Sequence, residues 1–311
     1  MNLVFMGNPA FAVPALEKLV ASDYQIVAVV SNPPQKMGRG KKIRETAIAI
    51  KAKSMGLHVI QEQDLKSDYF VSKLKDLDAD LFVVVAFRIL PNSLITIPKL
   101  GSINLHGSLL PAYRGAAPIQ WALINGEDET GLSTFYIEPK VDTGAVICQD
   151  KLPIHPNDNY GTLSEKMGIL GSDLLVKTIN LIKSGAASAI KQNDNQATSA
   201  PKITKVMTII DWSRSARELH NLVRGLTPTP GAVTIINGKR IKIQKTRVGN
   251  DDNGSNYLPG EITAIEKSIV VVQTGKGYLL IHRVQLEGKK TMDIGSFLNG
   301  FNLNIGDRFG L

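Results

Sequence analysis

The first half of the chain alternates short apolar runs with segments whose apolar residues have helical spacing. The apolar runs, at 3–6, 26–30, 81–86 and 103–105, are bounded by polar residues or glycine, as is typical of buried strands. Between them, residues 15–20, 46–55 and 71–77 carry apolar side chains at three- and four-residue intervals, which indicates helices. This alternation predicts an α/β fold with a mostly parallel sheet covered by helices on both faces. Ligands of such sheets bind beyond the carboxyl ends of the strands.

The second half of the chain has a different pattern. A long helical pattern at 160–183 closes the first domain, and residues 184–202 are poor in large apolar side chains, as in a linker. One helical pattern (213–223) and five short β runs follow, at 231–236, 241–248, 260–264, 269–273 and 278–286. Such strands predict a small β-barrel, of which the OB-fold is the commonest nucleic-acid-binding kind. We expect one domain over residues 1–188, a linker over 189–205 and a β domain over 206–311.

The charge of +8 is unevenly distributed. Residues 1–200 hold 20 basic and 19 acidic side chains, whereas residues 201–311 hold 16 and 9. This asymmetry predicts a polyanionic partner for the second domain. A solvated basic surface without a partner is the alternative, and charge alone does not decide between them.

Several classes of protein are excluded by the sequence. Cys148 is the single cysteine, so neither an intrachain disulfide nor a thiolate cluster is possible, and none of the five histidines has metal-ligand spacing. We therefore expect no metal site. Residues 1–19 lack a leading positive charge and are interrupted by Pro9 and Pro14, unlike a signal peptide. No apolar run approaches the roughly 20 residues that span a bilayer, so a cytoplasmic protein without membrane contact is expected.

Three polar residues indicate acyl-transfer chemistry. Asn104 and His106 lie two apart on a predicted strand and so share one face, and Asp142 follows an apolar run at 132–137. An amide, an imidazole and a carboxylate can stabilise charge and move protons around a tetrahedral carbon without a metal or a covalent nucleophile. Each signal alone has a structural alternative: a hydrogen-bonded core histidine, or an Asx turn at Asp142. The turn at 6–9 lacks GxGxxG spacing, which argues against a dinucleotide site.

Residues 36–53 form a strongly basic segment. They include seven basic residues and one acidic residue, with Gly-Arg-Gly-Lys-Lys at 38–42. A flexible cationic loop of this kind suits the binding of phosphates. A solvated basic loop is the alternative.

Taken together, these motifs resemble the formyltetrahydrofolate-dependent formyltransferase family. The resemblance lies in Asn104, His106, Ser-Leu-Leu-Pro at 108–111, Arg-Gly-Ala-Ala-Pro-Ile-Gln at 114–120 and Asp142-Thr143-Gly144. The 114–120 block, the 38–42 loop and Ile210-Asp211-Trp212 in a basic β-rich domain are similar to the methionyl-tRNA formyltransferase branch. The similarity covers essentially the whole chain. The family's Ala-Tyr-Gly-containing segment reads Ala-Phe-Arg-Ile-Leu-Pro at 86–91 here, one residue shorter.

The resemblance implies a Rossmann-like catalytic domain followed by an OB-like tRNA-binding domain. It implies transfer of the formyl group of 10-formyltetrahydrofolate to the free amino group of methionyl initiator tRNA, giving N-formylmethionyl-tRNA for translation initiation. Catalysis would fall to Asn104, His106 and Asp142. The folate would contact these residues: Ser108, Leu109, Leu110, Pro111, Phe87, Ile89, Leu90 and Val141. The tRNA would contact Arg39, Lys41 and Lys42, and a monomer is expected.

In this interpretation Asn104 and His106 donate hydrogen bonds to the oxyanion, while Asp142 pairs with His106 and helps to carry the proton. Two alternatives remain. A sugar-nucleotide or small-amine N-formyltransferase would use the same three residues but has no role for the basic domain. A non-catalytic RNA-binding protein would bind tRNA without transferring a formyl group.

Overall fold

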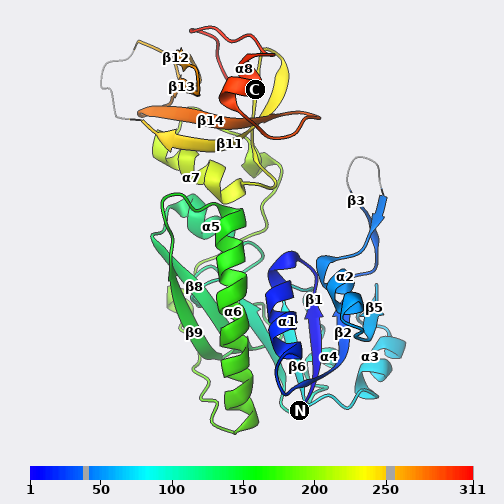
Figure 1. Ribbon diagram of the computed structural model, residues 1–311. Helices are drawn as coiled ribbons and strands as arrows, with labels where there is room; N and C mark the ends of the chain where they lie inside the picture. Colours follow the sequence, from blue (N-terminus) through cyan, green and yellow to red (C-terminus); the bar gives the residue numbers. More distant parts are fainter. Residues whose placement is uncertain (38–41, 250–255, 311) are drawn as a thin grey trace. The chain divides into compact units, whose positions relative to one another are not determined.

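The computed structural model describes residues 1–37, 42–249 and 256–310, which group into two compact units (Figure 1). Unit 1 comprises residues 1–118, 129–153 and 164–201, and unit 2 comprises residues 119–128, 154–163 and 202–311. Two short segments from the middle of the chain therefore belong to the C-terminal unit. The domain boundaries expected from the sequence remain a prediction.

Unit 1 is built on a seven-stranded, mostly parallel sheet. Its strands follow one another in the order β5 (Val59–Gln61), β2 (Gln25–Ser31), β1 (Asn2–Gly7), β6 (Leu81–Val85), β7 (Ser102–His106), β8 (Glu129–Tyr136) and β9 (Val146–Pro153). The first five are parallel, while β8 and β9 pair antiparallel with their neighbours. A separate hairpin joins β3 (Gln35–Met37) to β4 (Lys42–Arg44). The predicted α/β class is confirmed.

Helices cover both faces of this sheet. The helices of unit 1 are η1 (Ala10–Ala12), α1 (Val13–Val20), α2 (Ala47–Ser54), α3 (Asp68–Lys75), α4 (Asn92–Ile95), α6 (Tyr160–Lys183), which begins in unit 2, and η2 (Asp194–Gln196). On one face, α3 and α4 bury Phe70 and Leu94 against β1 and β6. On the other face α1 and α6 lie side by side (Figure 1), joined by an ion pair of 2.7 Å between Lys18 and Asp173. Gly171 lets α6 approach β7, since a Cβ there would lie 2.7 Å from Leu105 Cδ2.

Unit 2 is built on an antiparallel sheet. Its strands follow the order β10 (Ala232–Ile236), β11 (Lys239–Val248), β14 (Tyr278–Leu286), β13 (Ile269–Gln273) and β12 (Ile262–Glu266), and β15 (Met292–Asp293) pairs with β14. The end of the chain joins the two edges, because Gly310 bridges Ile235 and Arg308 bridges Glu261. Five strands closed in this way form the small β domain that the sequence predicts.

The helices of unit 2 are α5 (Pro118–Asn125, in this unit from Ile119), α7 (Ala216–Leu226), α8 (Ile294–Leu298) and η3 (Val206–Thr208). A capping box of Ser215 and Glu218 begins α7 and satisfies its free N–H groups. Trp212 stacks on Phe309, with 5.4 Å between the ring centroids, and donates a hydrogen bond to Thr234. Among the helices that the structure describes, none combines the length and apolar character needed to cross a bilayer.

Candidate active site

The side chains of strand β7 alternate between the two faces of the sheet. Leu105 faces Gly171 of α6, so Asn104 and His106 face the opposite side. The parallel pairing of β6 and β7 brings their carboxyl ends to the same edge of the sheet. Asn104 is partly exposed there, and within the described ranges no protein group hydrogen-bonds its side chain. The amide is therefore available to a ligand at the edge where the sequence predicts the site.

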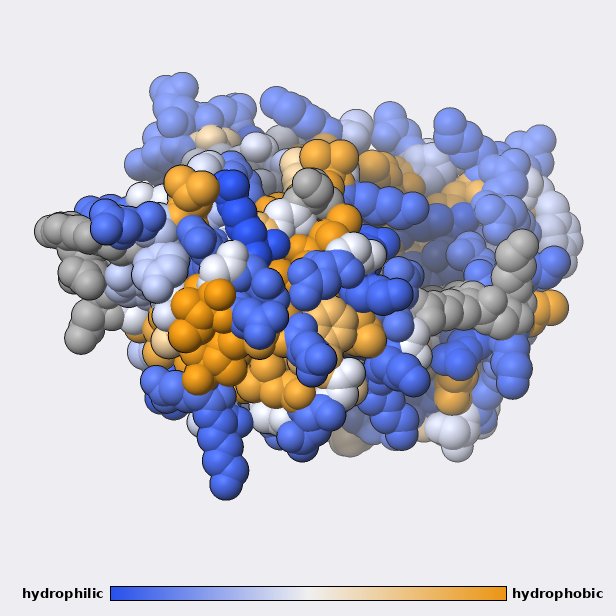
Figure 2. All heavy atoms as spheres, turned by 90° about the horizontal axis from the view of Figure 1, so that it is seen from above, coloured by the Kyte–Doolittle hydropathy of each residue, from blue (hydrophilic) through white to orange (hydrophobic). Residues whose placement is uncertain are grey.

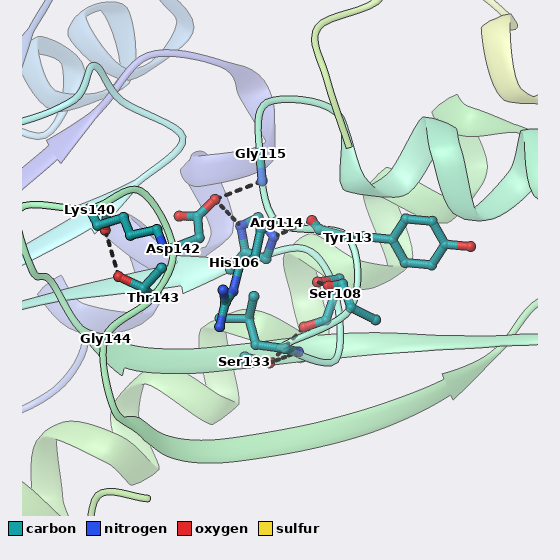
Figure 3. A network of polar contacts seen from close by, with 12 residues as sticks. His106, Ser108, Tyr113, Arg114, Gly115, Ser133, Lys140, Asp142, Thr143 and Gly144 are labelled. Atoms are coloured by element: carbon teal, nitrogen blue, oxygen red, sulfur yellow. Dashed lines mark hydrogen bonds and ion pairs between the residues drawn. The ribbon is translucent and has the colours of Figure 1, made fainter. Parts of the chain in front are cut away.

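His106 is held between a backbone carbonyl and a carboxylate (Figure 3). Its Nε2 lies 2.9 Å from the carbonyl oxygen of Tyr113. Because a carbonyl only accepts, Nε2 carries the hydrogen. The other ring nitrogen, Nδ1, lies 3.7 Å from Asp142 Oδ2, a distance within ion-pair range but longer than a hydrogen bond. The edge of Phe135 packs against the imidazole, which is 5% exposed.

Asp142 lies in the loop between β8 and β9, in the left-handed region with φ at +53°. Its Oδ2 accepts a hydrogen bond of 2.8 Å from the backbone N–H of Gly115 (Figure 3). Gly115 itself has φ at +128°, and a Cβ there would lie 2.6 Å from the carbonyl oxygen of Ala200. Only glycine fits at this position, so the Arg-Gly of the 114–120 motif has a structural reason.

The turn at 108–111 is fixed by side chains from β8 and β9. Ser133 Oγ accepts from the N–H of Leu110 at 2.9 Å and donates to the carbonyl of Ser108 at 2.6 Å. Gln149 Nε2 donates to both Ser133 Oγ and the Leu110 carbonyl. The Ser108 hydroxyl donates to the Ala112 carbonyl and is fully buried. The turn includes a cis peptide bond before Pro111. Its carbonyl oxygens at Ser108, Leu109 and Leu110 all accept hydrogen bonds from within the protein, so its shape is fixed by these contacts.

The remaining predicted folate contacts differ in exposure. Ile89 is 73% exposed and Val141 46% exposed, whereas Leu90 is buried in the core beneath α3 and α4 and Phe87 packs partly against it. Leu109 and Pro111 are half-buried. Apolar side chains left open beside a polar edge are typical of ligand sites.

Arg88 anchors the shortened 86–91 segment. Its guanidinium donates to the carbonyl oxygens of Glu62 and Gln63, the second at 2.7 Å, and lies 5.2 Å from the centre of the Phe87 ring. Burial lowers the pKa of Arg88 from its ordinary value, an effect that the nearby Glu62 and Asp64 oppose. Arg88 thus fixes the exposed Ile89 relative to the 62–63 loop.

Of the predicted tRNA contacts, the structure describes one. Lys42 begins β4 and is exposed, whereas Arg39 and Lys41 lie outside the described residues. The assignment of all three to tRNA stays a prediction.

The site also includes residues that no sequence motif indicates. The Tyr113 carbonyl holds His106, Ser133 and Gln149 hold the 108–111 turn, and Gln192 reaches the loop of Asp142. The register that puts Ser133 opposite His106 depends on the pairing of β7 with β8. Gln192 lies in the predicted linker, where no pattern in the sequence indicates a contact with the site.

Comparison with known proteins agrees with this geometry. A family model described as Formyl transferase matches residues 1–179, and one described as Formyl transferase, C-terminal domain, matches residues 202–302. Methionyl-tRNA formyltransferases from Halothermothrix orenii and Ruminiclostridium cellulolyticum are 42% and 37% identical, each alignment covering 100% of both chains.

Solved structures show the same fold. The N-formyltransferase from Helicobacter canadensis, crystallised with folinic acid and dTDP-3-aminofucose, superposes with a TM-score of 0.67 at 24% identity. The match covers 90% of this chain and 97% of that one. Family models for both parts and full-length relatives lead to one conclusion: this chain belongs to the formyl transferase family, in its methionyl-tRNA formyltransferase branch.

Proposed function

We propose that the protein transfers the formyl group of 10-formyltetrahydrofolate to the α-amino group of methionyl initiator tRNA, giving N-formylmethionyl-tRNA. The observation that carries this proposal is the convergence of Asn104, His106 and Asp142. These residues are up to 38 positions apart in the chain, yet His106 and Asp142 approach to 3.7 Å on the face that Asn104 shares. Full-length similarity to methionyl-tRNA formyltransferases supports the choice of acceptor.

The geometry supports two separate roles: Asn104 stabilises the developing charge, and His106 with Asp142 moves the proton. Asn104 has an uncommitted amide that can donate a hydrogen bond to a carbonyl oxygen placed beyond the strand end. His106 Nε2 is engaged with Tyr113, so Nδ1 is the nitrogen that can take up a proton, next to Asp142 Oδ2. An α-amine has a pKa near about 7.7–8, so part of it is neutral at cytosolic pH. The amine would bond to the formyl carbon as the bond from that carbon to the folate nitrogen breaks. The proton released by the amine would pass to the His106–Asp142 pair and from there to the departing folate nitrogen.

The open apolar side chains fit the folate. Ile89 and Val141 leave apolar surface uncovered, and the backbone of the 108–111 turn is held rigid from behind by Ser133 and Gln149. A flat ring system with polar edges suits such a surface. When bound, 10-formyltetrahydrofolate supplies the formyl group. Phe87, Ile89, Leu90, residues 108–111 and Val141 would hold it.

The basic strand β11 fits the tRNA. Lys239, Arg240, Lys245 and Arg247 are all exposed on this strand. Hydrophilic residues cover most of the face shown in Figure 2, around a smaller apolar area. For each phosphate that a basic side chain neutralises, the logarithm of the tRNA affinity falls by about 0.7–0.9 for every tenfold rise in salt concentration. We expect β11 and Lys42 to supply such contacts.

We also propose that the enzyme acts as a monomer in the cytosol. The site residues described above all come from unit 1 of one chain, so the site does not need a second copy. Translation initiation, which uses the product, takes place in the cytosol.

The test is incubation with charged initiator tRNA and 10-formyltetrahydrofolate, followed by mass analysis of the released amino acid. We expect N-formylmethionine. Parallel reactions with amino-sugar nucleotides as acceptors address the first alternative, and filter binding of the tRNA addresses the second. Formylation of the sugar amine alone, or tRNA binding without transfer, would overturn the proposal.

A further inference from the structure

Residues 190–200, part of the predicted linker, bond along their length to the two loops that carry the site. Ile190 pairs with Val146 through two hydrogen bonds of 2.8 Å. Thr198 accepts from the N–H of Arg114 at 2.9 Å, and the N–H of Ala200 donates to the Arg114 carbonyl at 2.7 Å. The segment is therefore a strap across the site loops rather than a free connection.

Gln192 is the centre of this strap and is only 9% exposed. Its Nε2 donates to the carbonyl oxygens of Asp142 and Gly144, at 3.0 and 2.8 Å. Its Oε1 accepts from Arg114 Nε and Nη2, at 3.0 and 2.8 Å. Because arginine only donates, the orientation of the amide is fixed, and both of its N–H groups and both oxygen lone pairs are used.

Arg114 connects Gln192 to the histidine. It lies between Tyr113, whose carbonyl holds His106, and Gly115, whose N–H holds the Asp142 carboxylate. Its guanidinium is 13% exposed and also pairs with Asp194 at 2.8 Å, a hydrogen bond that lowers the pKa of that exposed carboxyl. A closed ring of contacts thus runs from His106 through Tyr113, Arg114 and Gln192 to Asp142 and back.

Two members of this ring have backbones that need support. Tyr113 and Asp142 both have positive φ, at +59° and +53°. Such conformations persist only where neighbouring groups determine them. Gln192 supports the backbone conformation of Asp142, because its amide donates hydrogen bonds to the carbonyl oxygens of Asp142 and Gly144.

We propose that Gln192, oriented by Arg114, is a positioning residue that sets the place of the Asp142 carboxylate relative to His106. The proposal rests on the proposed function. Gln192 acts on the rate of formyl transfer and not on the binding of either substrate, because its polar atoms all face protein groups.

The test is Gln192→Met, which keeps the volume and removes the four hydrogen bonds. A misplacement of about 1 Å can cost about 100-fold in rate, so we expect kcat to fall about 10- to 100-fold. KM for methionyl-tRNA and for 10-formyltetrahydrofolate should stay within about twofold. Gln196→Met is the matched control, since Gln196 is exposed in the same segment and should keep full activity.

A double-mutant cycle distinguishes positioning from general damage. Adding Gln192→Met to Asp142→Asn should cause little further loss of kcat, because the group that Gln192 positions is already disabled. Gln192→Glu keeps the Arg114 contact but has no N–H to donate, and it should lose kcat in the same way. It serves as the second variant should Gln192→Met fold poorly.

The outcomes separate this inference from the proposed function. A wild-type enzyme that forms no N-formylmethionyl-tRNA overturns the proposed function and the inference with it. An active wild type with kcat of Gln192→Met within twofold overturns the inference alone. So does an equal fold loss in the wild-type and Asp142→Asn backgrounds, or a loss that appears only in KM.

Discussion

The site edge of unit 1 and the basic strand β11 of unit 2 organise polar groups in opposite ways. Around His106 and Asp142, donors are matched with acceptors, and two separate loops contribute backbone atoms to the same few contacts. Along β11, Lys239, Arg240, Lys245 and Arg247 are exposed, on a strand whose pairing with β14 shifts register on either side of Lys245. The chemistry of the site edge depends on the geometry of its contacts, whereas tRNA binding by β11 depends on the number of its positive charges.

This difference teaches where single changes should matter. A hydrogen bond in a closed network cannot be replaced by its neighbours, so removing one disturbs the rest. Charges on an exposed strand act together on a polyanion, and each contributes a small, nearly additive share. We therefore expect substitutions to have large effects on turnover at the site edge and small effects on tRNA binding at β11.

The largest effects are expected at the three predicted catalytic residues. Asn104→Ala, His106→Ala and Asp142→Ala should each reduce kcat about 100- to 1000-fold, since each removes a group that acts on developing charge or on the proton. Steady-state rates of N-formylmethionyl-tRNA formation measure this. Near-normal turnover in the Asn104 and His106 variants would remove the site assignment.

Gly115→Ala should come next, because two physical faults combine there. Alanine is strained at φ of +128°, and its Cβ would meet the Ala200 carbonyl at 2.6 Å, a backbone atom that cannot move away alone. We expect a loss of about 1–3 kcal/mol in the free energy of unfolding, with kcat lowered more than tenfold.

Gly185→Ala is the matched control for that variant. Gly185 also has positive φ, at +72°, but nothing lies within 4 Å of a Cβ there. It should show the strain without any change in kcat. Equal kcat values in the two alanine variants would mean that the Gly115 contact does not position the carboxylate.

The regular elements could be predicted well from the sequence. The helix α6 and the strands β13 and β14 have the bounds that the periodicity predicts, since each follows a clean period of 3.6 or 2. Strand β9 was not predicted, because its apolar residues lie at its two ends and do not alternate with polar ones, with Gln149, Asp150 and Lys151 between them. Strand β5 has three residues, too few for a period.

Only those residues of the candidate site that belong to a sequence motif could be predicted. Asn104 and His106 follow from strand alternation, and Asp142 from the family motif, but the 3.7 Å approach of His106 to Asp142 depends on how the loops fold. Gln192 shows the limit most clearly. Its segment has the composition of a linker, and its contacts with Asp142 and Arg114 exist only through tertiary structure.

A smaller effect, on stability, is expected at His220 in unit 2, which is partly buried. Burial lowers the pKa of His220 from 6.5 to about 4, with Arg224 and Arg217 adding to the shift. Below pH 6.5, His220 binds a proton in the unfolded chain but stays neutral in the folded unit. The free energy of unfolding therefore decreases as the pH falls from 6.5 toward about 4. The loss is at most about 3 kcal/mol.

Denaturant unfolding followed between pH 7 and about 5 measures this. Glu218, whose pKa is lowered to about 2 chiefly by its hydrogen bond with Arg214, contributes only below 4.5 and does not interfere. His220→Gln, which can still bond Thr246, should reduce the pH dependence and leave the share of His282, whose pKa burial also lowers. An unchanged slope in that variant would assign the acid sensitivity elsewhere.

The smallest effect is expected at β11, where Arg247→Ala should raise KM for methionyl-tRNA by about two- to fivefold and leave kcat unchanged. Removing one phosphate contact should also reduce the slope of log affinity against log salt by about 0.7–0.9. Lys267→Ala is the matched control, because Lys267 is exposed in the turn between β12 and β13 rather than on β11. Lys245→Ala combined with Arg247→Ala should give the product of the two single effects. A collapse of kcat in either variant would mean that β11 acts through geometry, as the site edge does, and the contrast between the two regions would fail.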